Sequence, residues 1–354
     1  MKWIKIDWQI LTPVILLFSL GLIIIGSVAP ALTATQLVFG LIALFIFILI
    51  SSLDYRLIFS LHLPIFFFFL ILMIIPFVFH TTNRGVTRWI PIGNSTFQPS
   101  EIMKPVVIMS FSVLFFSQLR HKYPLSIIVT ILPSTIIFIQ PDLGTFLILF
   151  VGILVILFSK YRLLHILGIT AMMLLLTIPT VEYLLRDYQK QRLFTYMDPY
   201  ADPLGNGYHV IQSVISVGSG KFLGRGLGQG TQSQLRFLPE HHTDFIFASL
   251  SEELGFVGNF IVLILFLVLF YRIYKISQIV NEPVGAAFSL AALSMLSFQT
   301  FVNIGMNIGL VPITGITLPF LSYGGSSLLS GAVFLGLISS ISRYHRPPLV
   351  YQIS

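Results

Sequence analysis

Long apolar runs separated by short polar segments set the pattern of this chain. Each run is close to the roughly 20 residues that a helix needs to cross a bilayer, and Gly and Pro punctuate the breaks between runs. The pattern therefore predicts ten membrane-spanning helices. The expected spans are residues 9–29, 35–52, 57–79, 101–118, 125–140, 143–159, 163–185, 245–271, 284–306 and 320–341.

Composition agrees with this pattern. The chain of 354 residues is 56% hydrophobic and 9% charged, and a soluble protein of that length could not bury so much apolar surface. We expect one all-α polytopic membrane domain spanning residues 1–354, whose first apolar run is a retained helix rather than a cleaved signal. The absence of cysteine excludes disulfides and thiol chemistry.

The basic residues are unevenly distributed between the two sides of the predicted bundle. With the N-terminus in the cytoplasm, the short outer loops carry only Arg84 and Arg88. The inner segments carry eleven of the 20 lysines and arginines: Lys2, Lys5, Arg56, Arg120, Lys122, Lys160, Arg162, Arg272, Lys275, Arg343 and Arg346. Because cytoplasmic loops are enriched in Lys and Arg, this distribution supports an even number of spans with both termini in the cytoplasm.

A long outer loop is expected between the seventh and eighth spans, at residues 186–243. Within it, GYHVIQSVIS predicts a short amphipathic helix at the membrane interface. Glycine then recurs between residues 218 and 230, which suits a backbone that bends sharply or comes close to a ligand. The stretch GSGKFLGRG is not a nucleotide-binding loop, because no Ser or Thr follows its lysine and no buried strand precedes it.

The segment FLPEHHTDFIFASLSEELGFVG concentrates charge at the start of the eighth span. If a helix begins near Pro239, Glu240 and Asp244 share one face of it. Acidic groups at a helix start can simply complement its dipole, but this does not account for Glu252 and Glu253 two or three turns deeper. We interpret Asp244 as catalytic or substrate-contacting. A structural role for the Glu252–Glu253 pair is at least as well supported.

Two histidines and several carboxylates in this segment raise the question of a metal. The spacing of His241 and His242 matches no strong metal signature, so hydrogen-bonded histidines are the better interpretation. We therefore assign no resident metal ligands and no definite cofactor; the candidate cations are Mg²⁺ and Mn²⁺. A divalent cation that bridges a substrate phosphate and a carboxylate is left open.

Two further segments combine polar groups with apolar spans. In NRGVTRWIPIGNSTFQPSEIMKP, Arg84 and Arg88 lie outside, Trp89 suits an interfacial anchor, and Lys104 falls one turn inside a span that Ser100 would cap. Glu101 can pair with Lys104, so a structural ion pair and an anion-binding role both remain open. In NIGMNIGLVPITGITLPFLSYGGSS, two prolines and five glycines predict broken backbone that either packs as a re-entrant turn or lines a cavity.

These motifs resemble those of the SEDS family (shape, elongation, division and sporulation proteins). The resemblance extends over essentially the whole chain and rests on Asn303, Gly309, Pro312 and Gly315 followed by FLSYGGSS, on FLPEHHTDFIFASLSEELGFVG, and on RWIPIG…FQPSEIMK. Thr314 stands where the division branch tends to have lysine, so the chain resembles the rod-shape branch more closely.

The resemblance implies a peptidoglycan glycosyltransferase that polymerises lipid II at the outer face of the bacterial cytoplasmic membrane, together with a class B penicillin-binding protein. The family's essential aspartate falls on Asp244, which we expect to be the catalytic base. We expect contacts with lipid II and membrane lipids, and none with nucleic acid. The expected substrate-binding residues are Glu101, Lys104, Arg84, Arg88, Trp89, Arg192, Glu240, His242, Ser322, Gly324, Gly325 and Ser326.

Two other functions fit buried charge and broken helices. A lipid II flippase would use the same features, although it would need polar groups along a path to both leaflets, whereas these cluster near one. A scaffold that only recruits the transpeptidase would leave the Asp244 cluster without a purpose.

Overall fold

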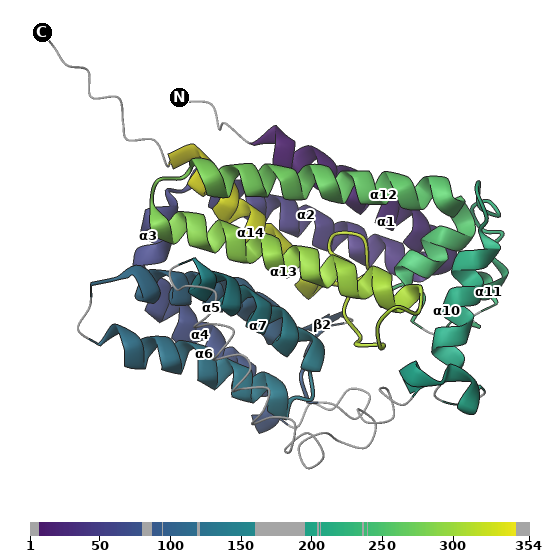
Figure 1. Ribbon diagram of the computed structural model, residues 1–354, viewed down its shortest axis with the longest axis horizontal. Helices are drawn as coiled ribbons and strands as arrows, with labels where there is room; N and C mark the ends of the chain where they lie inside the picture. Colours follow the sequence, from purple (N-terminus) through teal and green to yellow (C-terminus); the bar gives the residue numbers. More distant parts are fainter. Residues whose placement is uncertain are drawn as a thin grey trace, which may run out of the picture.

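The computed structural model is a bundle of long helices (Figure 1). It describes residues 7–79, 87–93, 95–118, 121–159, 195–203, 205, 207–235, 237–238 and 240–344. The elements are α1 (Trp8–Val28), α2 (Pro30–Ser52), α3 (Tyr55–Ser60), α4 (His62–Val78), β1 (Ile90–Ile92), β2 (Ser95–Phe97), α5 (Pro99–Phe116), α6 (Lys122–Ile139), α7 (Leu143–Phe158), η1 (Pro199–Ala201), α10 (Tyr208–Ser219), α11 (Thr231–Gln234), α12 (Ile246–Ile279), α13 (Pro283–Asn307) and α14 (Gly325–Tyr344).

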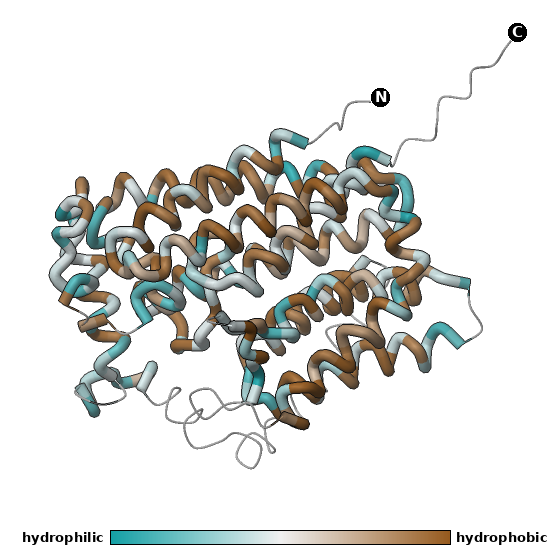
Figure 2. The backbone as a smooth tube through the Cα atoms, turned by 180° about the vertical axis from the view of Figure 1, so that it is seen from behind, coloured by the Kyte–Doolittle hydropathy of each residue, from teal (hydrophilic) through white to brown (hydrophobic). Residues whose placement is uncertain are grey.

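The helices confirm an all-α, multi-pass membrane architecture. Within the described residues, seven helices are long and apolar enough to cross a bilayer, and α4 and α7 are shorter apolar helices. These nine correspond to nine of the predicted runs, with α3 and α4 together matching the third; the run at 163–185 lies outside the described residues. Figure 2 shows brown, hydrophobic residues along the helices and teal, hydrophilic residues concentrated near their ends.

Helix α5 occupies the centre of the bundle. Of its residues, 83% are buried inside the protein, against 17% of the most apolar stretch of α2, which lies at the surface of the bundle. Helix α5 is less apolar than α2 and carries Glu101 and Lys104, which are costly to expose to lipid, and α4, α6, α7, α13 and α14 all contact it. The short hairpin β1–β2, which we did not predict, leads directly into α5 and pairs Ile90 with Phe97. The hairpin fixes the start of α5 at the edge of the bundle.

Helix α12 is broken near its N-terminal end. Gly255 has φ 64° and ψ −159°, and an added Cβ there would lie 2.2 Å from the main-chain nitrogen of Gly224. The predicted glycine-rich loop fills the break: the amide of Arg225 donates to Glu252 O at 2.9 Å, and the amide of Phe256 donates to Lys221 O at 3.0 Å. The glycines therefore serve close approach between two backbones, and the loop replaces the hydrogen bonds that the helix loses there.

The carboxylates of Glu252 and Glu253 anchor this loop. Glu252 accepts from the amides of Gln232 and Ser233 at 2.9 and 3.1 Å, and Glu253 accepts from the hydroxyl of Ser27 at 2.6 Å. Both side chains are buried. Both carboxylates contact only loop backbone and neutral side chains among the hydrogen bonds described. These contacts support the structural role that the sequence left open for the pair.

Candidate active site

Residues 240–245 form a turn that leads into α12. The prediction that Glu240 and Asp244 share a helical face is wrong, because the helix begins at Ile246 and Glu240 has φ 50°. The main-chain oxygens of residues 242–244 accept hydrogen bonds from other elements, which removes the acceptors that a helical turn would need. Tertiary contacts therefore override the helical spacing of this segment.

The irregular segment between α13 and α14 holds this turn from one side. The amide of Tyr323 donates to His242 O at 2.9 Å, and the hydroxyl of Ser322 donates to Thr243 O at 2.7 Å. The predicted broken backbone is confirmed, since α14 begins only at Gly325 rather than at residue 320. The segment supplies hydrogen-bonding groups that a continuous helix could not offer.

Two asparagines of α13 hold the turn from the other side. The Nδ2 atoms of Asn303 and Asn307 donate to Asp244 O at 2.9 and 3.0 Å. Asn303 also donates to Ile316 O at 2.7 Å, and Asn307 accepts from the amide of Ala248 at 3.1 Å. Both asparagines are completely buried. The main chain of Asp244 is therefore fixed, which leaves its carboxylate on the cavity side of the turn.

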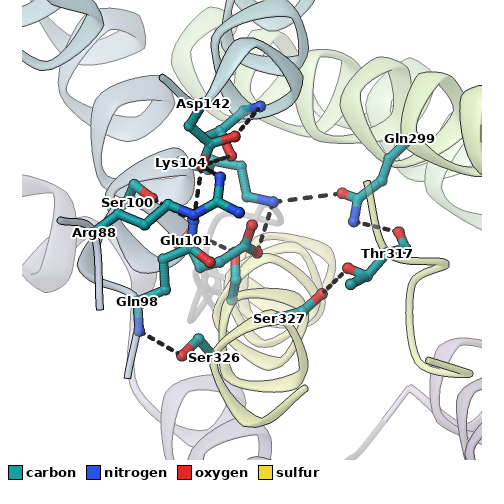
Figure 3. Close-up of polar contacts among 12 residues, drawn as sticks. Arg88, Gln98, Ser100, Glu101, Lys104, Asp142, Gln299, Thr317, Ser326 and Ser327 are labelled. Atoms are coloured by element: carbon teal, nitrogen blue, oxygen red, sulfur yellow. Dashed lines mark hydrogen bonds and ion pairs between the residues drawn. The ribbon is translucent and has the colours of Figure 1, made fainter. Parts of the chain in front are cut away.

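A buried ion pair lies at the start of α5. Lys104 Nζ is 2.8 Å from Glu101 Oε2, as the spacing of the two residues predicted, and Lys104 is 2% exposed. Figure 3 shows the ammonium group between Glu101 and Gln299, whose Oε1 accepts from it at 3.5 Å. Gln299 in turn donates to Thr317 O at 2.9 Å. The pair thus links α5, α13 and the irregular segment. Ser100 is not the helix cap, because Gln98 occupies that position.

Arg88 projects over the cavity from the segment before β1. Its Nη1 lies 3.5 Å from Asp142 Oδ2, which also accepts from Gln98 Nε2 at 2.8 Å (Figure 3). The guanidinium group lies 5.6 Å from the ring centre of Trp89. Asp142 additionally caps α7 through the amide of Thr145. The arginine is therefore held by a carboxylate that the α6–α7 connection supplies.

A cavity of about 340 Å³ lies between these two groups of residues. Nine of the predicted site residues line it: Arg88, Trp89, Glu101, Glu240, His242, Asp244, Gly324, Gly325 and Ser326. Lys104 lies behind Glu101, and the Ser322 hydroxyl is engaged with the main chain of Thr243, so neither is part of the wall. Arg84 and Arg192 lie outside the described residues.

Several wall residues were not predicted. Asp142, Thr145, Gln299, Thr317 and Tyr323 all line the cavity. Two sequence signals could have indicated two of these residues. Asp142 lies in the polar QPDLG break between two short apolar runs, and Gln299 lies four residues before Asn303 in a largely apolar span. Neither signal shows which distant segment the side chain meets.

The carboxylates of the cavity are the groups that could bind a divalent cation. Among the described residues no group of three or more His, Cys, Asp or Glu side chains is arranged to hold a metal ion. His241 is tied to main-chain oxygens of Leu238 and Val28 at 3.0 and 3.2 Å. Glu240 and Asp244 both face the cavity, and magnesium is commonly held by one or two carboxylates plus substrate phosphates. A single cavity carboxylate such as Glu240 therefore fits a cation that arrives with a phosphorylated substrate, while Asp244 stays available as a base.

Comparison with known proteins decides the family. The FtsW/RodA/SpoVE family, described as "Cell cycle protein", matches residues 3–347. The chain belongs to this family. It is 38% identical to the peptidoglycan glycosyltransferase MrdB of Escherichia coli K12 over 282 residues, covering 78% of this chain and 76% of MrdB. It is 36% identical to stage V sporulation protein E of Bacillus subtilis over 360 residues, covering 94% of this chain and 95% of that protein.

Solved structures of family members share the fold. A chain from a peptidoglycan synthase complex, whose structure concerns the coordination of polymerization and crosslinking, has a TM-score of 0.81 and 31% identity, covering 99% of this chain and all of that one. The rod shape determining protein RodA of Thermus thermophilus has a TM-score of 0.72 and 26% identity, covering 98% of this chain and all of that one. The expected membership in the SEDS family is therefore confirmed.

Proposed function

We propose that this protein is a peptidoglycan glycosyltransferase that joins the disaccharide units of lipid II into glycan strands for cell elongation and shape. The observation that carries the proposal is the polar cavity in an otherwise apolar bundle, with Asp244 on one wall and Arg88 and Glu101 on another. Family members that match this chain are named peptidoglycan glycosyltransferases. A bundle that concentrates acidic and basic groups around one cavity is suited to act on a charged, membrane-tethered substrate.

Asp244 has the environment that a catalytic base requires. Transfer needs a group that accepts the proton of the attacking sugar hydroxyl while that hydroxyl displaces a pyrophosphate at the anomeric carbon with inversion. The Asp244 main chain is fixed by Asn303 and Asn307, and its carboxylate lies beside Gly315, where an added Cβ would be 3.5 Å from Oδ2. Fixing the backbone reduces the reorganisation needed to bring the carboxylate to the hydroxyl.

The opposite wall supplies positive charge for the leaving group. Arg88 presents a planar fork of donors that can bind two phosphate oxygens at once, and Asp142 holds it in place until then. The Glu101–Lys104 pair lies deeper and keeps the ammonium charge close to the cavity without exposing it. A divalent cation held by one cavity carboxylate, such as Glu240, and by the pyrophosphate would add Lewis-acid stabilisation of the departing phosphate.

The setting of the enzyme follows from the same features. We place it in the bacterial cytoplasmic membrane with its cavity at the outer face. Lys and Arg are concentrated on the side where α1 begins and α14 ends, and the cavity lies toward the opposite ends of those helices. A class B penicillin-binding protein is the proposed partner, supported by the similarity to a chain of a peptidoglycan synthase complex. The loop at 186–243 would belong to the same single domain.

The test is polymerisation of purified lipid II by the protein with its transpeptidase, followed on a gel. Wild-type protein and Asp244→Asn are compared at equal folding and equal complex formation. Polymer from the wild type alone supports the proposal with Asp244 as base. Equal polymer from both removes Asp244 from that role. Binding of lipid II without polymer from either protein favours a flippase, and retained cell growth with Asp244→Asn favours a scaffold.

A further inference from the structure

Gln36 is an unusual residue on α2, whose side chains are mostly exposed at the surface of the bundle. It is 1% exposed, whereas the next two residues of α2, Leu37 and Val38, are 44% and 55% exposed. A primary amide buried at membrane depth is costly unless its donor and its acceptor are both used. Its presence therefore points to a specific partner within the protein.

Both ends of the Gln36 amide bind the irregular segment before α14. Nε2 donates to Ser322 O at 3.1 Å, and Oε1 accepts from the amide of Gly324 at 3.2 Å. These two bonds flank Tyr323, whose own amide donates to His242 O at 2.9 Å. The backbone of Tyr323 is thus clamped between α2 and the turn that carries Asp244.

A second residue of α2 leaves this backbone no room to shift. Phe39, about one turn after Gln36, packs so closely that a Cβ added to Gly325 would lie 2.6 Å from its ring. Phe39 also lines the cavity. Helix α2 therefore forms a rigid support behind the wall that Tyr323 completes.

The Tyr323 side chain faces the cavity beside His242. The two rings meet edge to face, with centroids 5.6 Å apart and an interplanar angle of 65°. Among the described residues no hydrogen bond to the Tyr323 hydroxyl is found, and Tyr323 lines the same cavity as Asp244. A phenol keeps its proton at neutral pH, so the hydroxyl can donate.

We propose that the Tyr323 hydroxyl donates a hydrogen bond to an oxygen of the sugar–pyrophosphate substrate, and that Gln36 is a positioning residue that sets the place of Tyr323. The proposal rests on the glycosyltransferase function and adds a substrate-contacting group that the sequence did not indicate. Gln36 lies behind the wall and acts only through the backbone on either side of Tyr323.

The test is a double-mutant cycle on lipid II polymerisation by the complex with the transpeptidase. Tyr323→Phe removes only the hydroxyl, and we expect kcat/KM to fall about tenfold, with most of the change in KM. Gln36→Leu should give a similar or larger fall. Because both changes affect one contact, the double variant should lose much less than the product of the two single effects.

A matched control separates positioning from stability. Ser340→Ala also removes a buried hydrogen bond, from its hydroxyl to Leu53 O at 2.6 Å, but at the other end of the bundle. It should leave kcat/KM within twofold. If Gln36→Leu does not fold, Gln36→Glu takes its place in the cycle, because it keeps the acceptor for the Gly324 amide and loses only the donor to Ser322 O. Melting in detergent checks that each variant is folded.

The outcomes distinguish this inference from the proposed function. A wild-type complex that makes no polymer overturns the glycosyltransferase assignment and this inference with it. Active wild type with an unchanged Tyr323→Phe variant overturns only the contact. Losses that multiply in the double variant show that Gln36 acts on stability and not through Tyr323, and overturn the positioning role.

Discussion

The clamp on Asp244 can be tested by removing Asn303. Its Nδ2 is shared between Asp244 O at 2.9 Å and Ile316 O at 2.7 Å, and the side chain is completely buried. In Asn303→Ala, Asp244 O keeps its bond from Asn307, whereas Ile316 O loses the partner that Asn303 provided. An unpaired buried carbonyl costs about 1–3 kcal/mol.

That free energy sets the expected size of the effect. With Asn303 gone, Asp244 O is held by Asn307 alone, and a shift of the Ile316 backbone toward another donor moves the wall beside Asp244, so the carboxylate leaves its reactive position for most of the time. At about 1.4 kcal/mol per factor of ten, a cost of about 1–3 kcal/mol corresponds to a roughly 5- to 150-fold fall in kcat. The KM for lipid II should change little, because Asn303 does not line the cavity.

The assay is steady-state polymerisation of lipid II by complexes matched for folding. Asn259→Ala is the control: it removes the acceptor at 2.9 Å from the Ser251 hydroxyl, which keeps Phe247 O at 2.6 Å, and it does not touch Asp244. A folded Asn303→Ala enzyme with kcat within twofold of wild type would refute the clamp. Equal losses in both variants would show a general effect of weakened packing.

Four further outcomes are expected. Arg88→Lys should raise KM for lipid II about tenfold, because an ammonium cannot bind two phosphate oxygens in the geometry of the guanidinium fork; an unchanged KM contradicts the phosphate role. Glu101→Gln should destabilise the protein by about 3–5 kcal/mol, because the buried ammonium of Lys104 loses its counter-charge. Adding Lys104→Met should recover most of this loss. Melting in detergent measures both, and an unchanged melting temperature for Glu101→Gln contradicts the prediction. Gly255→Val should prevent correct folding, since a Cβ would lie 2.2 Å from a facing main-chain nitrogen, whereas Gly218→Ala, with no atom within 4 Å, should fold normally. If a cation bridges the pyrophosphate and a cavity carboxylate, chelation should slow polymerisation and added Mg²⁺ should restore it; full activity after thorough chelation removes the cation.

The sequence indicated the helices because their signal is local. Continuous apolar runs of bilayer length can only be helices in lipid, where every main-chain group must be paired within its own segment. It did not indicate the β1–β2 hairpin, whose short strands carry no long pattern. It also extended helical spacing across Glu240 and Asp244, where hydrogen bonds from Asn303, Asn307 and Ser322 determine a turn instead.

The candidate site divides in the same way. Asp244, Arg88 and Glu101 were identifiable because charged residues are rare in this apolar chain. A charge near or inside a membrane span is costly, so it usually has a function. Their neighbours Asp142, Gln299 and Tyr323 are ordinary residues by sequence. They become part of the site only because the helices bring them to one cavity.

By itself, the sequence determined that this protein spans the membrane many times and that its chemistry lies near one face, since hydropathy and charge act locally and require no knowledge of contacts. Only the tertiary structure decided that Lys104 lies behind Glu101, that the glycine-rich loop closes the break in α12, and that Gln36 supports the backbone beside Tyr323. The last two depend on hydrogen bonds between segments brought together by packing, and the first depends on which helices cover the start of α5. The energy of such a bond is set by geometry and burial, which the order of residues does not reveal.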